Sequence, residues 1–539
     1  MLSKLSFPHV FGVCTALGWC ISKTTSKPLL ETLPLIYLTI LPIYATLYVS
    51  FIYPFYISEL RHVPTVRGYP LWGQFFTIVT EECGVPQRRW FKEHGPIIRY
   101  FFPFAAERIA IADDKAIHQM TVRNPYNYPK PVRAKLWMVR ILGEGVLLAE
   151  GDEHVHQRKA LAPGFSIGSI RALAPVFWQK ALLLSKLWKD EMMESQVDTK
   201  SIEVLEWLNR TTLDIIGQAG FGTDINSLEN PQTPIREAYR LVFAFDIGSR
   251  ILHGMQAFMP STKYIPAKMN RDMEAARNII FNKAMDIIKE KEGQAEADTK
   301  HNDIIALISK DNFKKKTEGE EGLSLKTMRD QVMTFLGAGH DTTATGVAWT
   351  LHLLAKYPKI QSRLRDEIRE YMPWLFDKTT RNDPIELAKV DADQLPYLDN
   401  VCRESLRYIP PIPMTVRESI ADDKLGPYFI PSGTIVYVLA NSINRLPMYW
   451  GPTADEFDPD RWDDLPGTYT KNAFMTFLQG PRGCVGRKFA ETEMKIILCC
   501  LLSLYNFEPD KSIADPEELK MWRLVLRPRD GVSLNTTLL

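Results

Sequence analysis

The chain has 539 residues, with 65 Lys and Arg against 64 Asp and Glu, and its formal net charge is +1. A near-neutral chain gives no electrostatic reason to expect a nucleic-acid partner. Hydrophobic residues make up 45% and charged residues 24%, values that exclude disorder for the bulk of the chain. Length alone suggests about three or four domains. Seven cysteines in so long a chain form no disulfide framework, so we expect a reducing compartment.

An uncharged run extends from Thr32 to Ser58 near the N-terminus. Its length exceeds the roughly 20 apolar residues that a bilayer span needs. Its tyrosines suit membrane interfaces, and Pro42 should kink a helix there. We therefore predict an N-terminal membrane-anchoring region over residues 1–58, with the main span at about 33–57. The alternative is a buried core helix.

Residues 5–22 are also apolar apart from His9. They could form a signal peptide, an interfacial helix or a first span, and the sequence leaves these alternatives open. Arg61 and Arg67 follow the longer run and favour a cytosolic main body. Residues 59–74 are rich in Pro and Gly and predict an irregular connector. Residues 75–539 contain no linker or repeat, which indicates one large domain instead of three.

The main body carries mostly helical patterns. The clearest lies at residues 324–355, where Ser324 is a plausible cap and apolar residues recur every three or four positions. Short strands are expected at 97–102, 109–111, 433–439 and near the C-terminus. The highly charged segment 289–322 predicts a solvated loop. The fold class is therefore mainly α with a minor β-sheet.

Cys484 lies in the segment FLQGPRGCVGRKFA. Gly480, Gly483 and Gly486 allow tight turns and the close approach of a flat ligand. A helix that begins near Arg487 would direct its positive end towards the sulfur and stabilise a thiolate. Such a thiolate is a metal ligand or a nucleophile. No neighbouring His or Cys supplies a zinc or redox spacing, which leaves a single axial ligand.

The pattern F-x-x-G-x-R-x-C-x-G resembles the cysteine loop of the cytochrome P-450 haem-thiolate enzymes; it consists of Phe477, Gly480, Arg482, Cys484 and Gly486. Two further motifs follow the order of that family. The first is E-x-x-R, formed by Glu404 and Arg407, and the second is Pro459-Asp460-Arg461-Trp462. The resemblance implies a Glu-Arg-Arg triad with a structural role.

The spacing of the triad fits that role. Glu404 and Arg407 are three residues apart, so they share one helix face, and Arg461 could share the same carboxylate through bidentate bonds. Loss of the triad should cause a folding and haem-retention defect. The alternative for each motif is an ion pair on the surface.

The segment Ala338-Gly339-His340-Asp341-Thr342-Thr343 is similar to the A/G-G-x-D/E-T-T motif of the family. Ala338 and Thr342 are four residues apart and share a helix face, and Gly339 would let the helix open locally. The resemblance implies that Asp341 and Thr342 are an acid–alcohol pair that passes protons from solvent towards dioxygen. The alternative is a solvent-facing polar patch.

Two arginines resemble propionate-binding positions of the family. Arg158 keeps its half of a W-x-x-x-R pair, while His154 stands where the family usually has Trp. His154 either contacts a haem propionate or packs in the interior. Arg417 falls where a further propionate-binding arginine is often found, and its alternative is an ordinary charge at a strand edge.

The resemblance covers about residues 60–530 and implies a cytochrome P-450 fold, with a single large haem domain behind the anchor. Haem b would lie between the helix of Thr342 and the helix after Cys484, with Cys484 as axial iron ligand. The implied cofactor-binding residues are Cys484, Arg482, Phe477, Gly486, Arg158, Arg417 and Ala338. The implied activity is that of a haem-thiolate monooxygenase that uses dioxygen.

Electrons must come from another protein, because no G-x-G-x-x-G dinucleotide motif or fused flavin domain fits beside this fold. The resemblance implies NADPH-derived electrons through a separate flavoprotein, an NADPH-cytochrome reductase, on the cytosolic face of the endoplasmic reticulum membrane. It would dock on positive charge near the thiolate, for which the candidates are Arg158, Lys159, Arg487 and Lys488.

Substrate-lining segments of the family correspond to residues 126–148, 241–265 and 412–416, which are mostly apolar and suit a lipophilic small molecule. The similarity to anchored fungal members favours a terpenoid or polyketide intermediate of secondary metabolism, with fatty-acid or alkane hydroxylation as the alternative. Two hypotheses from other classes are a reductase-independent haem-thiolate isomerase or dehydratase and a non-catalytic haem sensor. Asp341 and Thr342 argue against the first of these two.

Overall fold

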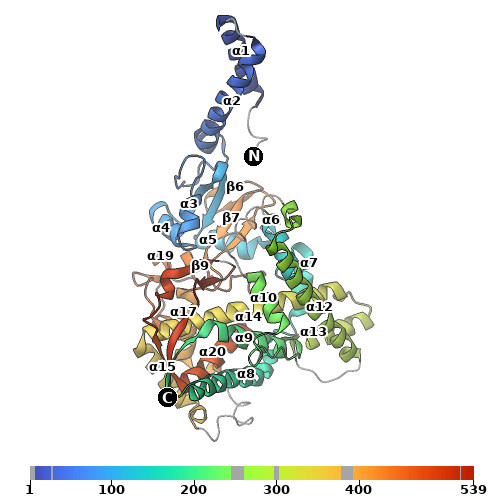
Figure 1. Cartoon of the computed structure of the whole chain (residues 1–539), viewed down its shortest axis with the longest axis vertical. Helices are drawn as coiled ribbons and strands as arrows, with labels where there is room; N and C mark the ends of the chain where they lie inside the picture. Colours follow the sequence, from blue (N-terminus) through green and yellow to red (C-terminus); the bar gives the residue numbers. More distant parts are fainter. Residues whose placement is uncertain are drawn as a thin grey trace. The chain divides into compact units, whose positions relative to one another are not determined.

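The computed structural model describes residues 7–25, 28–243, 256, 260–296, 303–377, 392–522 and 524–539 (Figure 1). The chain divides into two compact units. One comprises Met1–Tyr128 with Val416–Leu439, and the other comprises Pro129–Thr415 with Ala440–Leu539. The domain boundaries that the sequence suggests, at 58/59 and 74/75, stay predictions.

The first unit is built around a four-stranded sheet of order β1-β2-β7-β4. Strand β2 pairs antiparallel with β1 and parallel with β7, with Ile109 opposite Val436. Strands β5 and β6 form a separate antiparallel hairpin. The strands of this unit are β1 (Ile97–Phe102), β2 (Ala106–Ile111), β4 (Thr415–Glu418), β5 (Asp423–Leu425), β6 (Tyr428–Ile430) and β7 (Ile435–Val438). Its helices are α1 (Phe7–Thr25), α2 (Leu29–Leu47), η2 (Tyr48–Ile57), α3 (Phe75–Thr80), α4 (Val85–His94), η3 (Pro103–Ala105), α5 (Asp114–His118), η4 (Gln119–Arg123) and η5 (Pro125–Asn127).

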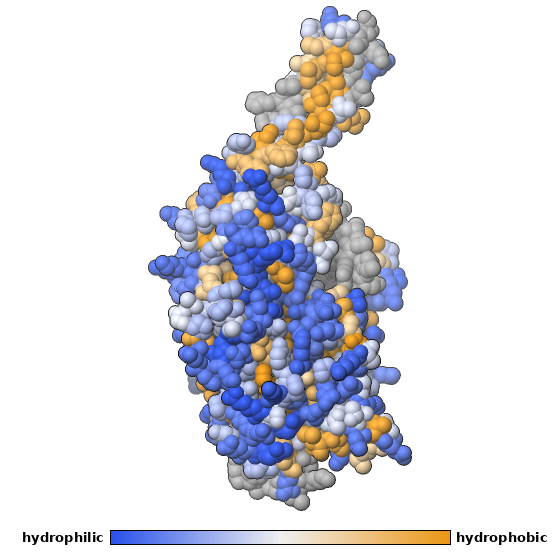
Figure 2. Space-filling view, turned by 90° about the vertical axis from the view of Figure 1, so that its left-hand side faces the viewer, coloured by the Kyte–Doolittle hydropathy of each residue, from blue (hydrophilic) through white to orange (hydrophobic). Residues whose placement is uncertain are grey.

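The N-terminal helices expose large hydrophobic side chains; examples are Phe11, Trp19, Leu38 and Ile43. Figure 2 shows orange, hydrophobic surface along this part of the chain. Pro42 lies inside α2, and the π-helix η2 begins directly after the end of α2. In the described part of the chain, no single helix is long and apolar enough to cross a membrane. The segments Ile36–Tyr44 and Tyr48–Ile57 are bent by 41° at their junction. Together, but not singly, they are long and apolar enough to cross a membrane.

The second unit is mainly helical and carries the three-stranded sheet β3-β11-β8 and the pair β10-β9. Its strands are β3 (Thr199–Glu203), β8 (Tyr505–Pro509), β9 (Lys520–Trp522), β10 (Leu526–Pro528) and β11 (Ser533–Leu538). Its α-helices are α6 (Val132–Leu142), α7 (Gly151–Leu161), α8 (Ile167–Glu194), α9 (Val204–Ile215), α10 (Pro234–Phe243), α12 (Lys268–Glu296), α13 (Ile304–Thr317), α14 (Leu325–Lys356), α15 (Pro358–Tyr371), α17 (Pro396–Tyr408), α18 (Ala440–Ile443), α19 (Pro447–Trp450) and α20 (Arg487–Leu504). The short helices are η6 (Ile216–Gly220), η7 (Pro260–Tyr264), η8 (Pro373–Leu375), η9 (Ala392–Gln394), η10 (Pro459–Trp462), η11 (Lys471–Ala473) and η12 (Pro516–Leu519).

Helix α14 is the long helix that the apolar spacing predicts. The Ser324 side chain caps its N-terminus by accepting a hydrogen bond of 3.1 Å from the Thr327 N–H. The helix packs against α9 and α20 (Figure 1). The predicted strands at 97–102 and 433–439 are confirmed as β1 and β7, and the one at 109–111 is the end of the longer β2.

The prediction of a solvated loop over residues 289–322 is wrong for 289–296 and 304–317, which are helical, while residues 318–322 do form a largely exposed turn. Helix α12 extends to Glu296, and α13 covers Ile304–Thr317. The Asp303 side chain caps α13, and Lys314, Lys315 and Lys316 lie in its last turn, where they stabilise the negative end of the helix dipole. Many of the charged residues of this segment therefore belong to the solvated face of a helix and to its C-terminal turn, not to a loop.

Candidate active site

The central part of α14 is buried apart from one solvent-accessible patch on one of its faces. All residues from 330 to 355 are buried except Ala338, Gly339 and Thr342. Positions i, i+1 and i+4 lie on the same side of a helix. The Thr342 hydroxyl donates a 2.9 Å hydrogen bond to the Ala338 carbonyl, one turn back. The predicted face therefore exists, and it is accessible at the three small or polar residues of the motif.

Gly339 has a different role from the one expected of it. Helix α14 is continuous from Leu325 to Lys356, so the glycine does not open it. A Cβ atom at Gly339 would come within 3.2 Å of the Ile216 side chain of η6. The glycine therefore allows η6 to pack closely against α14. The Thr212 hydroxyl of α9 reinforces this contact by donating to the His340 carbonyl at 2.9 Å.

The loop before α20 places the Cys484 thiol in an unusual environment. The Cys484 N–H donates to the Phe477 carbonyl at 2.8 Å, and Gly480 has a φ of 73°, which favours glycine. The Cys484 side chain is exposed. Even so, surrounding protein desolvates the thiol and raises its pKa, while a hydrogen bond from the Gly486 N–H and the charge of Arg158 lower it. The sulfur is therefore accessible although protein surrounds much of it.

Positive charge gathers beside this loop. The Arg158 guanidinium donates to the Gly483 carbonyl at 2.8 Å, and Arg482 pairs with the Glu150 carboxylate. His154 is 3% exposed. Its pKa is lowered to about 4 by desolvation and then by the charges of Arg482, Arg158 and Lys130. His154 is thus neutral at physiological pH, and this cationic cluster suits an anionic group of a ligand.

Glu404 is the centre of the predicted triad. Arg407 binds it through two bonds, from Nε to Oε2 at 2.8 Å and from Nη2 to Oε1 at 2.7 Å. Arg461 Nε donates to Oε1 at 3.4 Å. The Trp462 indole and the Asp458 N–H donate to the same carboxylate at 3.1 and 2.9 Å. The side chains of Glu404 and Arg407 are fully buried, so the surface ion-pair alternative is excluded.

Asp341 is not solvent-facing. Its residue exposure is 1%, and its carboxylate pairs with the Arg527 guanidinium of β10. Desolvation lowers the pKa of Arg527 to about 10, which leaves it charged at physiological pH. Sequence reasoning missed this partner, because Arg527 lies far away along the chain and belongs to no motif.

A family model supplies the deciding comparison, because the cytochrome P450 model matches residues 63–535. The chain belongs to the cytochrome P450 family. Family membership makes this protein an oxidoreductase, a haem-dependent monooxygenase that acts on a small molecule and uses dioxygen and a redox partner.

Several fungal proteins are similar over nearly the whole chain. Cytochrome P450 monooxygenase sphH of Aspergillus fumigatus is 33% identical and covers 92% of this chain and 91% of its own length. FUM15 of Gibberella moniliformis is 31% identical, with coverage of 88% and 87%. ALT8 of Alternaria alternata is 30% identical, with coverage of 86% and 87%. All three carry the name cytochrome P450 monooxygenase.

The residues of this cytochrome P450 fit a haem group. The exposed but desolvated Cys484 sulfur would hold the iron, and metal binding would deprotonate the thiol. Arg158 and Arg482 would meet the propionates. The accessible face at Ala338 and Thr342 would border the haem. Phe477 and Gly486 shape the loop around the sulfur, through the Phe477 carbonyl and the Gly486 N–H.

Arg417 and the four candidate docking charges also belong to the predicted cytochrome P450 site. Arg417 belongs to β4 in the first unit, where its guanidinium donates to the Val416 carbonyl at 3.0 Å; its propionate contact stays a prediction. Of the four candidate docking charges, Arg487 pairs with Glu491 and Lys488 with Asp393, while Lys159 is exposed. Substrate segment 241–265 lies mostly outside the described residues.

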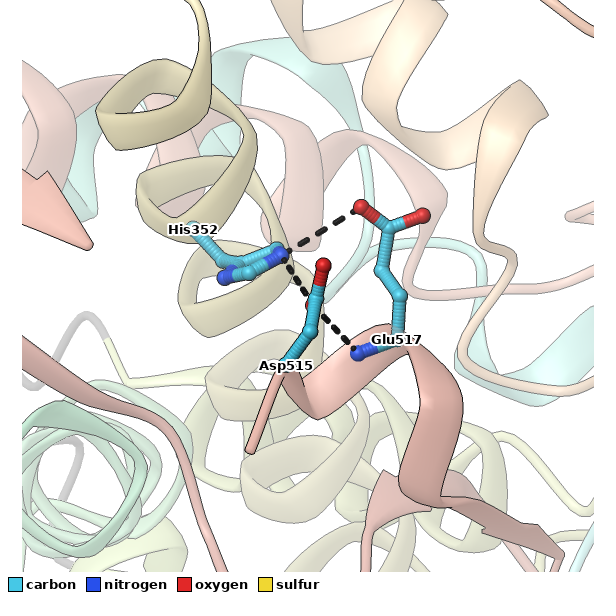
Figure 3. Close-up of side chains that lie close together, drawn as sticks. All are labelled: His352, Asp515 and Glu517. Atoms are coloured by element: carbon cyan, nitrogen blue, oxygen red, sulfur yellow. Dashed lines mark hydrogen bonds and ion pairs between the residues drawn. The ribbon is translucent and has the colours of Figure 1, made fainter. Parts of the chain in front are cut away.

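The described residues contain one group of His, Asp and Glu side chains close enough to share a metal ion: His352, Asp515 and Glu517 (Figure 3). The Lys356 ammonium contacts Glu517 at 2.7 Å and Asp515 at 3.2 Å. Hydrogen bonds and charges from His352 and Lys356 offset desolvation and lower the pKa of Glu517 to about 2. This ion-pair network fastens the end of α14 to η12.

Proposed function

We propose that this cytochrome P450 inserts one oxygen atom of dioxygen into a lipophilic small molecule. The substrate class that we favour is a terpenoid or polyketide intermediate of fungal secondary metabolism. The observation that carries the haem site is the exposed but desolvated Cys484 sulfur, together with the break in burial at Ala338, Gly339 and Thr342. The similar fungal cytochrome P450 monooxygenases support a monooxygenase of secondary metabolism, and the apolar segments 126–148 and 412–416 support a lipophilic substrate. Fatty-acid or alkane hydroxylation remains the alternative.

The chain supplies binding, orientation and proton transfer. Bound haem would supply the oxidation chemistry, as cofactors do in general. Cys484 would hold the iron, while Arg158, Arg482 and neutral His154 would orient the propionates. Thr342 lies on the accessible face of α14, and Asp341 is the residue directly before it. This acid–alcohol pair would hold and move protons beside that face.

The proposed function predicts turnover that needs both oxygen and a reductase. Full-length protein in vesicles, mixed with a fungal NADPH-cytochrome reductase, should consume NADPH and oxygen. Extracts of a deletion strain should accumulate the substrate, which the mixture converts to a product heavier by one oxygen atom. Isotopic oxygen in that product is the measurement. Conversion of the same compound without NADPH would instead support the isomerase or dehydratase hypothesis, and no conversion under any redox supply would support the sensor.

We also propose that α2 and η2 anchor the protein in the endoplasmic reticulum membrane, with the catalytic domain in the cytosol. The support is the apolar composition of the bent pair and the arginines at positions 61 and 67. The two natural glycosylation sequons test this poorly. Asn209 lies inside α9 and Asn535 on β11, which pairs with β3 and β8, so folding would block modification on either side of the membrane.

An exposed turn gives a sharper test of orientation. Pro231→Asn creates an Asn-Gln-Thr sequon at an exposed position of the turn before α10. We expect no glycan on this variant when it is expressed in fungal cells, as judged by its unchanged mobility after deglycosylation. The matched control carries the same substitution in residues 59–539, without the proposed anchor, behind a cleavable signal peptide and should gain a glycan. A glycan on the variant without that peptide would contradict the cytosolic orientation.

A further inference from the structure

The side chains of His352, Asp515 and Glu517 form a cluster that the predicted haem site does not use (Figure 3). His352 belongs to α14 and lies roughly 15 Å along the helix from Thr342, at 1.5 Å per residue. The two carboxylates flank Pro516 at the start of η12. One ligand atom from each of the three side chains lies within 4.8 Å of the other two. This spacing makes the cluster a candidate for a shared cation.

Two separations in this cluster are long for hydrogen bonds. His352 Nε2 lies 3.4 Å from Asp515 Oδ1 and 3.3 Å from Glu517 Oε1. Hydrogen bonds between N–H groups and oxygen usually measure about 2.7–3.2 Å. Around a tetrahedral Zn²⁺ ion with bonds of about 2.0–2.1 Å, by contrast, neighbouring ligand atoms are about 3.3–3.4 Å apart. The imidazole and the two carboxylates therefore already have the spacing of a metal site.

The surrounding structure holds the three side chains in place. His352 is 3% exposed and packs edge-on against the Trp349 ring, with 5.8 Å between the ring centroids. Its Nδ1 atom has no hydrogen-bond partner among the described residues, so Nδ1 is free to carry the proton while Nε2 binds a cation. The Asp515 carboxylate accepts a 2.9 Å hydrogen bond from the Glu517 N–H, which fixes the two carboxylates relative to each other. Because the Asp515 side chain is partly exposed, a cation can reach the cluster from solvent.

The charges of the cluster are incompletely balanced. Among the described residues, Lys356 is the one ammonium or guanidinium group that pairs with the Asp515 and Glu517 carboxylates. With a neutral imidazole, one ammonium against two carboxylates leaves a negative charge, which a divalent cation in the same place would neutralise. The Lys356 side chain is 39% exposed, so it can turn into solvent and leave its place to another cation.

We propose that His352, Asp515 and Glu517 bind a Zn²⁺ ion, which takes the place of the Lys356 ammonium and keeps a water molecule as its fourth ligand. The donor set favours zinc, because imidazole and carboxylate ligands in a tetrahedron suit this ion, whereas Ca²⁺ and Mg²⁺ prefer oxygen ligands. The ion would join the C-terminal end of α14 to η12 through bonds to three side chains. This inference goes beyond the proposed monooxygenase function, in which the ion takes no part.

Four variants test the ligands and the exchange. His352→Gln removes the imidazole, Glu517→Gln removes one negative ligand, and Lys356→Met removes the competing ammonium. His94→Gln is the matched control, because it removes a partly exposed histidine that lies 3.8 Å from the Glu93 carboxylate and outside the cluster. Each full-length, haem-loaded protein is dialysed against buffered Zn²⁺, and its zinc and iron contents are measured by elemental analysis. X-ray absorption at the zinc edge then gives the lengths of the bonds to zinc.

The wild type should bind one zinc ion per haem, with nitrogen and oxygen ligands at about 2.0–2.1 Å and no sulfur at about 2.3 Å. His352→Gln and Glu517→Gln should each weaken zinc binding by about 100-fold or more, because loss of a partner outside the ligand shell already costs about 10- to 100-fold. Lys356→Met should tighten zinc binding by about tenfold, since the ion no longer competes with a positive charge. His94→Gln should match the wild type.

A zinc–sulfur distance would place the ion on a cysteine and overturn the site. Equal zinc affinity in the wild type and in Glu517→Gln, or an unchanged affinity in Lys356→Met, would overturn it as well. If the buried His352→Gln variant lost its haem, these two variants at partly exposed positions would decide the question. No measurement needs turnover, so a protein that binds no zinc would leave the monooxygenase standing, and an inactive protein that binds zinc would leave the site standing.

Discussion

Replacement of Cys484 by alanine should abolish the absorption that a thiolate-ligated haem gives in its reduced carbon monoxide complex, and product formation with it. Cys484 is the cysteine of the glycine-rich loop, and its sulfur is exposed yet desolvated. Without this ligand, the positive end of α20 and the Arg158 charge have no thiolate to stabilise. The measurement is the difference spectrum of the purified variant, alongside its total haem content.

The matched control for this prediction is Cys402→Ala. Cys402 is buried in α17, and desolvation raises the pKa of its thiol, as expected for an inert structural cysteine. Its truncation should leave the carbon monoxide spectrum intact. An unchanged spectrum in Cys484→Ala would contradict the assignment of Cys484 as the haem ligand and would favour the alternative that its sulfur is a nucleophile.

Local patterns predicted those parts of the structure that depend on neighbouring residues. The apolar spacing and Ser324 predicted α14, and the i,i+3 spacing placed Glu404 and Arg407 on one face of α17. The glycine-rich loop before α20 was also identified, because turn chemistry and a helix start are encoded over a few residues. The mainly helical class followed from the same patterns.

Long-range partners could not be predicted in this way. Arg527 pairs with Asp341 and Glu150 with Arg482, yet neither Arg527 nor Glu150 stands in a recognisable motif. Similarly, strand β7 returns to pair with β2 after more than half the chain, which only tertiary packing specifies. The burial of Asp341 excludes the alternative of a solvent-facing polar patch, but only the tertiary structure identifies Arg527 as its partner.

Composition also misled where one property has two structural meanings. The charged segment 289–322 was assigned to a loop because charge correlates with solvent exposure. Helix α13 satisfies the same correlation, since one face is solvated while Ile304, Ile305 and Ile308 are buried. Glycine gave a similar ambiguity at Gly339, where flexibility and close packing are both consistent with a missing side chain. In both cases the neighbouring helices decide between the alternatives.

The triad should give the largest loss of stability. Glu404→Ala leaves two buried guanidinium groups, those of Arg407 and Arg461, without their carboxylate. Breaking a buried ion pair in this way costs about 3–5 kcal/mol of unfolding free energy. Arg407 also donates to the Asn444, Ala454 and Glu456 carbonyls, so the variant would loosen the segment that precedes the cysteine loop. Chemical denaturation of the haem-loaded protein measures the loss.

An exposed ion pair in the same region provides the control. Asp460 of η10 pairs with Arg363 at 2.7 Å, and both side chains are about half exposed. Asp460→Ala should therefore cost only about 0–1 kcal/mol. If Glu404→Ala proved as stable as Asp460→Ala, the triad would not be a structural element. Full stability of Glu404→Ala combined with slow turnover would instead assign Glu404 a direct part in the chemistry. The complete burial of its side chain on α17 argues against such a part.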